Sequence, residues 1–170
     1  LKYMGIENVA VLDGGFDKWV KEKRPTSLEV TETVGAPYKG EMNRKLFVKK
    51  ADVAAKLGSA LIVDVREAPF FKGEKKLDFV AKTGRIKGAV NLPSSLLYKE
   101  DGTYKGKDDL AAAATAVVGT DKAKEMILYC DTGKFATAWA YILTDLLGYT
   151  HVAVYDGSSQ EWRICPCRNT

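Results

Sequence analysis

The sequence predicts an α/β fold in which a mainly parallel sheet is flanked by helices on both faces. Short apolar runs of strand length alternate along the chain with helical segments, which is typical of βαβ units. The runs are almost continuously apolar, as expected for strands that are covered on both faces. At 170 residues, of which 46% are hydrophobic and 28% charged, the chain is long enough to bury the core of one ordinary domain.

The first half of this domain contains a helix and two expected strands. A short helix is expected at 52–57, because Gly58 follows it and glycine is favoured just past a helix end. Residues 60–64 (ALIVD) form an apolar run that suits a buried parallel strand. Residues 88–92 (GAVNL) read as another short strand, which Pro93 ends.

The second half continues the alternation. Residues 108–118 are alanine-rich with two acids at the start, which is typical of a helix. Residues 126–129 (MILY) predict a third buried strand, and 135–147 predict a helix that is apolar on nearly every face and therefore largely interior. Residues 152–155 (VAVY) predict a fourth strand, followed by a short helix that carries Trp162.

Composition excludes several classes of protein. No apolar run approaches the roughly 20 residues that a membrane span needs, so we expect no membrane span. Three cysteines are too few for a disulfide-stabilised scaffold. The net charge of +4 is not gathered into a basic stripe with interleaved aromatic residues, so we expect no nucleic-acid partner.

The chain repeats its own end. Residues 4–19 and 147–162 are identical at seven of 16 positions, at a constant offset of 147 − 4 = 143. This offset matches the length of a whole domain rather than the period of a solenoid. We therefore expect residues 1–24 to be the tail of a preceding domain, 25–45 to be a linker, and 46–170 to be one complete copy. For such a fragment we expect a cytoplasmic location, with a periplasmic one as the alternative.

A cysteine stands where ligands bind in a parallel sheet, at the carboxyl end of a strand. Cys130 follows strand 126–129 and precedes a helix, whose unpaired N–H groups and dipole favour a thiolate. Gly133 permits a tight bend, while Lys134 adds a positive charge that Asp131 opposes; sequence does not say which of the two side chains points inward. The alternative is an inert core cysteine, which is more typical within an apolar run than at its polar end. The position favours a reactive cysteine.

Four motifs resemble the rhodanese family in order and spacing. They are Asp64-x-Arg66-Glu67, residues 84–93 (GRIKGAVNLP), Cys130-x-x-Gly133, and Tyr155-Asp156-Gly157-Ser158 with Trp162. The resemblance covers residues 47–162, and within the family it is similar to the tandem-domain thiosulfate and 3-mercaptopyruvate sulfurtransferases. It implies a rhodanese-like three-layer domain and, for residues 4–19, the end of a preceding rhodanese-like domain that would be a partner within the same protein.

The resemblance also implies a reaction. Cys130 would take a sulfane sulfur from a small anionic donor, become a persulfide, and pass the sulfur to a thiol or to cyanide. Such a double displacement requires no metal and no organic cofactor, so we expect neither. We therefore expect a sulfurtransferase with Cys130 as its catalytic residue.

Substrate contacts are expected from the cysteine loop and the neighbouring strand end. The candidates are Arg66, Asp131, Thr132, Gly133, Lys134, Phe135 and Ala136. Arg66 could hold an anionic donor with its planar fork, or form a structural ion pair with Asp64 or Glu67, and both alternatives stay open. Thr132 and Lys134 could contact a sulfonate or a carboxylate, and the ring of Phe135 could narrow the mouth.

The loop departs from both family patterns. Thiosulfate enzymes often carry two basic residues after the cysteine and mercaptopyruvate enzymes carry small polar ones, so the donor stays open. Arg85 is expected to have a structural role, tying its loop to the sheet edge.

Two other functions compete with sulfur transfer. A noncatalytic rhodanese-like binding module typically lacks the cysteine, which is present here. A cysteine-dependent phosphatase needs an arginine six residues after the cysteine, where this chain has Ala136. His151, the only histidine, precedes a strand and does not favour a Cys–His dyad. Near the end of the chain, Cys165 and Cys167 could relay sulfur, form a disulfide with a partner or bind a metal.

Overall fold

The computed structural model describes residues 1–32, 34–35 and 37–162, and the chain divides into two compact units. The smaller unit comprises Leu1–Arg44 with Tyr98–Tyr104, and the larger comprises Lys45–Leu97 with the chain from Lys105 onward. Cys165 and Cys167 lie outside the described residues, so the hypotheses about them stay untested.

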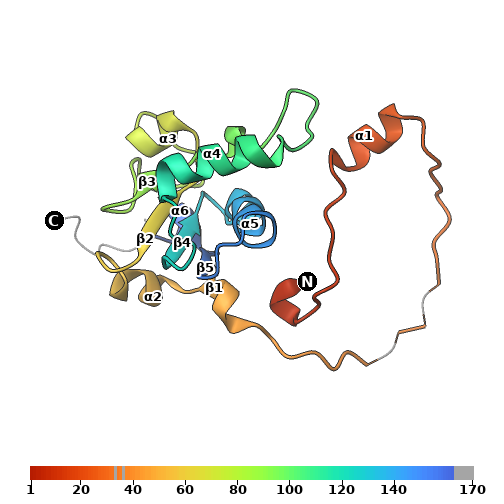
Figure 1. The fold of residues 1–170 in the computed structure, drawn as a ribbon, viewed down its shortest axis with the longest axis horizontal. Helices are drawn as coiled ribbons and strands as arrows, with labels where there is room; N and C mark the ends of the chain where they lie inside the picture. Colours follow the sequence, from red (N-terminus) through yellow and green to blue (C-terminus); the bar gives the residue numbers. More distant parts are fainter. Residues whose placement is uncertain (33, 36, 163–170) are drawn as a thin grey trace. The chain divides into compact units, whose positions relative to one another are not determined.

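The larger unit is built on one parallel sheet (Figure 1). Its strands lie in the order β1-β5-β4-β2-β3, and every pairing is parallel. They are β1 (Phe47–Val48), β2 (Leu61–Asp64), β3 (Val90–Asn91), β4 (Met126–Tyr129) and β5 (Val152–Tyr155). The strand at 126–129 and the strand at 152–155 have the predicted bounds, whereas β3 covers only part of 88–92, and β1 was not predicted because two residues give no apolar pattern.

The helices of this unit alternate with the strands, which confirms the α/β prediction. They are α2 (Lys50–Ala55), α3 (Ala68–Lys72), α4 (Lys107–Val118), α5 (Lys134–Tyr141) and α6 (Ser158–Trp162). Short 3₁₀ turns lie at Arg44–Leu46 and Ser94–Leu96, and a π-helical segment, Ile142–Leu146, continues α5.

Two helix boundaries differ from the sequence expectation for local reasons. The helix expected at 52–57 begins earlier, because the Asp52 carboxylate accepts a hydrogen bond from the Lys49 N–H at 2.8 Å and so closes the helix start from its first turn. The helix expected at 135–147 changes to π-helical geometry after Tyr141, where the Thr144 hydroxyl donates to the Ala140 carbonyl at 2.9 Å.

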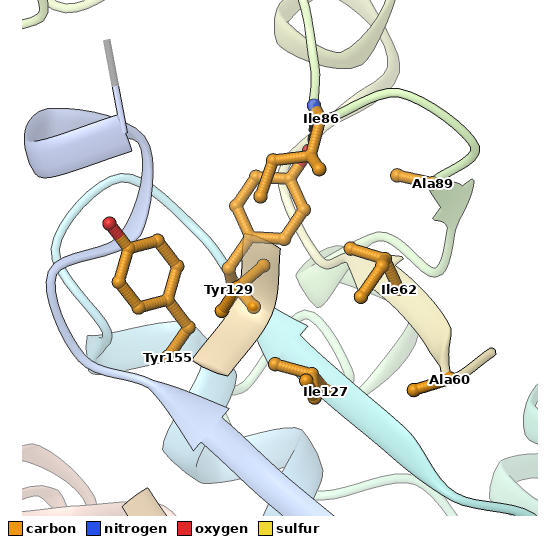
Figure 2. Close-up of a cluster of buried hydrophobic side chains, with 8 residues drawn as sticks. Ala60, Ile62, Ile86, Ala89, Ile127, Tyr129 and Tyr155 are labelled. Carbon is orange, nitrogen blue, oxygen red and sulfur yellow. Dashed lines mark hydrogen bonds between the residues drawn. The ribbon is translucent and has the colours of Figure 1, made fainter. Parts of the chain in front are cut away.

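Side chains of alternate strand residues fill the space on the two faces of the sheet. On one face Ile62, Ile127, Tyr129 and Tyr155 form a buried cluster, drawn in Figure 2. The helices α2, α3 and α6 cover this face with Val53, Phe71 and Trp162, respectively. Residues that alternate with these along the strands, namely Val63, Met126, Leu128, Val152 and Val154, are also buried.

The opposite face of the sheet is covered by α4 and α5. Helix α5 packs against β4 and β5, and α4 packs against β3 and the π-helical segment. Leu110 and Ala114 of α4 and Trp139 of α5 are each 0% exposed. Helices therefore lie on both faces, and the three-layer prediction is confirmed.

The smaller unit contains little regular structure. A 3₁₀ turn, Lys2–Met4, and helix α1 (Gly15–Lys21) are its helical elements among the described residues of 1–43, and no described residue of 1–44 is buried. The two repeated segments share a turn and a helix but not a strand: residues 9–12 pair with no described strand, whereas residues 152–155 form β5. Throughout the described part of the chain, no helix is long and apolar enough to cross a membrane.

Candidate active site

The carboxyl ends of β2 and β4 bring the predicted site residues to one edge of the sheet. These strands are direct neighbours, with Asp64 opposite Tyr129 in register. Cys130 follows β4 and is 1% exposed. Its N–H donates to the Ser158 hydroxyl at 3.2 Å, and its carbonyl accepts from the Ser159 N–H at 3.0 Å. The backbone of Cys130 is therefore held by the segment that follows β5.

Gly133 turns the chain from the strand end into α5. Its φ of +83° lies in the left-handed region, which glycine adopts without strain. A Cβ at this position would lie 3.0 Å from the Asp156 carboxylate and 3.2 Å from the Asp156 carbonyl oxygen. Both the conformation and the close approach of Asp156 therefore require a glycine here.

The start of α5 leaves backbone donors unused. The first backbone hydrogen bond of this helix runs from the Thr137 N–H to the Gly133 carbonyl, at 3.0 Å. The N–H groups of residues 132–136 donate to no other described residue, as expected for the first turn of a helix. Such donors can bind an anion next to Cys130. Their direction towards the sulfur stays a prediction.

The side chains of the loop differ in exposure. Thr132 and Lys134 are exposed, and the Phe135 ring is 45% exposed. Ala136 is fully buried, so only its backbone N–H is a candidate for a substrate contact. The loop therefore presents one hydroxyl, one ammonium group and one aromatic ring at its surface.

Arg66 forms the structural ion pair that the sequence left as one of two alternatives. Its Nε lies 2.9 Å from Asp64 Oδ1, its Nη2 lies 2.7 Å from Asp64 Oδ2, and Nη2 also donates to the Gly84 carbonyl at 2.8 Å. The Arg66 side chain is 3% exposed and Asp64 is fully buried. Glu67 is not the partner, because its carboxylate accepts from Ser94 and Ser95. A contact between Arg66 and a sulfur donor stays a prediction.

The charged state of this pair is stabilised by its geometry. Burial lowers the pKa of Arg66, but the hydrogen bonds and the charge of Asp64 outweigh this effect and raise the pKa above its ordinary value. Tyr129 donates its hydroxyl proton to Asp64 at 2.6 Å. The Tyr129 hydroxyl also accepts from the Ile86 N–H at 3.0 Å, a bond that lies beside the Ile86 label in Figure 2. Burial and the neighbouring Asp64 raise the pKa of Tyr129 well above its ordinary range, so Tyr129 is a neutral donor.

Asp131 is turned towards the protein rather than left free at the loop surface. Its Oδ1 accepts from the Ser159 hydroxyl at 2.6 Å and from Arg66 Nη1 at 3.3 Å. Lys134, by contrast, is exposed. The structure thus separates the two charges that oppose each other in the sequence.

Arg85 has the expected structural role, but it contacts helix α3 rather than the edge of the sheet, and His151 lies before a strand as expected. Arg85 donates to the Phe71 carbonyl at 3.2 Å and its guanidinium lies 4.5 Å from the centre of the Phe71 ring, so it ties its loop to α3. The His151 carbonyl accepts from the Met126 N–H at 2.9 Å, which places His151 beside the start of β4. Cys130 follows the other end of that strand, so the pair forms no dyad.

Sequence reasoning offered Asp64 as a partner of Arg66 but missed Tyr129, Ser158 and Ser159 as structural partners at the site. Asp64 and Ser158 stood within recognised motifs, but nothing in a one-dimensional pattern shows that a residue near 160 binds one near 130. The signal that could have found them is the rule that adjacent parallel strands end at the same edge of a sheet.

A family model described as Rhodanese-like domain matches residues 49–165. The chain belongs to the rhodanese family. Among curated rhodanese relatives, a Mycolicibacterium smegmatis protein with the provisional name thiosulfate sulfurtransferase is 34% identical over 95% of this chain and 60% of its own length. The sulfur carrier protein TtuD of Thermus thermophilus is 33% identical over the same shares of the two chains. This rhodanese chain therefore spans about 60% of the length of these relatives.

Solved structures of similar fold include the anaerobic ergothioneine biosynthesis enzyme of Chlorobium limicola in complex with trimethyl histidine. It superposes with a TM-score of 0.85 at 25% identity, over 97% of this chain and 41% of that one. A persulfide form of EanB, in a tetrahedral intermediate state with ergothioneine, gives the same TM-score and identity. These similarities support sulfur chemistry at the level of the family.

Proposed function

We propose that this rhodanese domain is a sulfurtransferase in which Cys130 carries the sulfur as a persulfide. The observation that carries the proposal is the position of Cys130 between the end of β4 and the first turn of α5. The N–H groups of residues 132–136 are unused there. A persulfide anion in a largely enclosed position needs several such donors in place of water, each worth about 1.5–3 kcal/mol.

The reaction balances without an added oxidant, reductant or cofactor. The Cys130 thiolate attacks the outer sulfur of thiosulfate, an S–S bond forms to Cys130, and the S–S bond of the donor breaks with release of sulfite. The acceptor, cyanide or a thiolate, then attacks the outer sulfur of the persulfide, and Cys130 leaves as a thiolate. With 3-mercaptopyruvate the bond that breaks is a C–S bond, and the electron pair stays on the carbon fragment, which takes up a proton. This is nucleophilic catalysis in two displacements.

The exposed side chains of the loop give the donor-binding part of the proposal. Lys134 and Thr132 would contact the sulfonate or carboxylate of an anionic donor, and the exposed ring of Phe135 would limit the size of what enters. Asp131, which is already bonded to Ser159 and Arg66, would act on the loop rather than on the donor.

Mass spectrometry of the intact protein tests the proposal. Exposure to thiosulfate and, separately, to 3-mercaptopyruvate should add about 32 Da to one cysteine, because one sulfur atom is retained, and the larger yield identifies the better donor. Peptide mapping should place the added mass on Cys130 rather than on Cys165 or Cys167.

Replacement of the nucleophile is the matched control. Cys130→Ser should abolish sulfur transfer and leave the melting temperature nearly unchanged, because a hydroxyl of similar size is a poor nucleophile and cannot hold a sulfane sulfur. Full thiocyanate production from thiosulfate and cyanide by this variant would remove Cys130 from its proposed role. Absence of any mass gain in the wild-type protein would favour a noncatalytic binding module.

We also propose that residues 1–24 are the end of a preceding rhodanese-like domain, that 25–45 link it to the catalytic domain, and that the catalytic domain comprises 46–170. The repeated sequence at an offset of 143 supports this organisation, as does the greater length of the relatives. Supplying residues of such an upstream domain in the same chain should protect Phe16, now 66% exposed, from hydrogen exchange and chemical labelling. Unchanged labelling would count against it.

A further inference from the structure

Three consecutive residues after β5, Ser158 to Gln160, form hydrogen bonds with the backbone of Cys130 and Asp131. The Ser158 hydroxyl accepts from the Cys130 N–H, and the Ser159 N–H donates to the Cys130 carbonyl. The Gln160 N–H donates to the Asp131 carbonyl at 3.1 Å. Ser158 has a φ of +49°, a conformation that is uncommon outside glycine, so the segment is shaped for these contacts.

Ser159 adds a bond to the side chain of Asp131. The two oxygens lie 2.6 Å apart, and Ser159 is 1% exposed, so water does not compete for this hydroxyl. The same carboxylate oxygen lies 3.3 Å from Arg66 Nη1. Arg66 also donates to Asp64 and to the Gly84 carbonyl, and the shortest hydrogen bond of Asp131 is the one from Ser159.

We propose that Ser159 is a positioning residue that holds the Asp131 carboxylate on Arg66 and so keeps the charge beside Cys130 neutralised. A free carboxylate next to the nucleophile would disfavour its thiolate, because like charges a few ångströms apart repel in a partly enclosed site. The bond between Ser159 and Asp131 thus allows Cys130 to be an anion although an acidic residue follows it directly in the loop. The role rests on the proposed function, but the charge effect can be measured without any sulfur donor.

Several charged groups surround the loop and enter the electrostatic balance. Asp131 and Lys134 belong to the loop itself, Asp64 and Arg66 come from the end of β2, and Asp156 approaches Gly133 from the turn after β5. Arg66 bonds both the buried Asp64 and the partly buried Asp131. The Ser159 hydroxyl carries no charge, so loss of its bond changes the position of Asp131 without removing a charge.

The test is the pH dependence of Cys130 alkylation by iodoacetamide in the full chain, followed by peptide mass spectrometry. Ser159→Ala should raise the pH of half-maximal alkylation by on the order of half a pH unit, because the released carboxylate opposes the thiolate. The double variant Ser159→Ala with Asp131→Asn should return this pH to the wild-type value or below it, because the charge is gone. A purely structural role for Ser159 predicts no such rescue.

Ser95→Ala is the matched control, since it removes another hydroxyl-to-carboxylate bond, from Ser95 to Glu67 at 2.7 Å, and should leave the alkylation pH unchanged. Where Ser159→Ala lowers the melting temperature too far to be assayed, Asp131→Asn alone is the test, and the alkylation pH of this variant should fall.

The proposal is overturned if Ser159→Ala is folded and titrates like the wild type, if the double variant shifts as much as the single one, or if Asp131→Asn does not lower the alkylation pH. Failure of the wild type to gain sulfur from either donor would instead overturn the proposed function and leave this result unaffected.

Discussion

Residues 9–19 and 152–162 share much of their sequence, yet they have different structures. Val154 is 3% exposed and its counterpart Val11 is 48% exposed. Tyr155 is fully buried, whereas Leu12, at the same place in the repeat, is 58% exposed. The same Val-Ala-Val pattern thus lies in a strand in one copy and outside any strand in the other.

The difference lies in the neighbours of each segment. β5 lies between β1 and β4 and pairs with both. Residues 9–12 pair with no strand of the described chain. A strand makes its hydrogen bonds with other segments, so its sequence pattern becomes structure only beside partners.

The turn and helix behave differently because their bonds are local. Helix α1 begins after Gly14, and helix α6 begins after Gly157 at the matching position of the repeat. A helix forms its hydrogen bonds within one segment, so both copies show it although only one is packed into a core. In this repeated pattern the turn and the helix are therefore local structures, whereas the strand depends on the rest of the domain.

The largest expected effect separates the two copies directly. Val154→Asp should lower the free energy of unfolding by about 3–5 kcal/mol, because a carboxylate would be buried without a partner. The equivalent change Val11→Asp should alter it by less than about 0.5 kcal/mol. Urea unfolding followed by circular dichroism measures both. Similar losses in the two variants would show that Val11 is also packed into a core.

A second change tests how the segment after β5 shapes the cysteine loop. Gly133→Val places a side chain against Asp156. It should lower kcat/KM for sulfur transfer about a hundredfold, as expected when a reacting group is displaced by about 1 Å. Gly148 has a φ of +75° but no atom within 4 Å of an added Cβ. Gly148→Val is therefore the control: both variants should lose roughly 1–2 kcal/mol of stability to backbone strain, and only Gly133→Val should lose activity. Equal activity in the two variants would contradict the role of the loop.

The smallest effect concerns the tyrosine that replaces Leu12 in the second copy. Burial and the 2.7 Å hydrogen bond to Glu161 raise the pKa of Tyr155 above its ordinary value. The unfolded chain ionises this tyrosine near pH 10 while the folded chain does not, so the stability that Tyr155 contributes is complete below about pH 10 and is lost as the pH rises further. Tyr155→Phe should lower the free energy of unfolding by about 1 kcal/mol at neutral pH. It should also make the fall of this free energy above pH 10 less steep.

Leu12→Tyr supplies the control for this measurement. A tyrosine at that exposed position should ionise at the same pH in the folded and the unfolded chain. It should therefore add nothing to the pH dependence of the free energy of unfolding. The variants are compared by thermal unfolding between pH 8 and pH 11. The loss of stability with rising pH that remains in Tyr155→Phe comes from Tyr129, whose pKa is also raised. An unchanged alkaline decline in Tyr155→Phe would show that other groups cause it.

The sequence alone determined the features whose signals are local. Continuous apolar runs placed β4 and β5, because strands buried on both faces leave an unbroken pattern. The polar residues after β4 and the glycine at 133 placed the cysteine loop, since a strand end, a tight turn and a helix start follow one another within a few residues. The same reasoning yielded the α/β class and the cysteine as the candidate nucleophile.

Only the tertiary structure decided the matters that depend on residues far apart in the chain. The sequence did not say which acid Arg66 would pair with, and the structure shows that it is the buried Asp64, which Tyr129 from the next strand also bonds. The orientation of Asp131 followed from Ser159, 28 residues further along the chain. The two-residue strands β1 and β3 likewise exist through their neighbours. The physical reason is the same in each case: hydrogen bonds and ion pairs between distant segments depend on where folding brings those segments, and a local pattern carries no record of that.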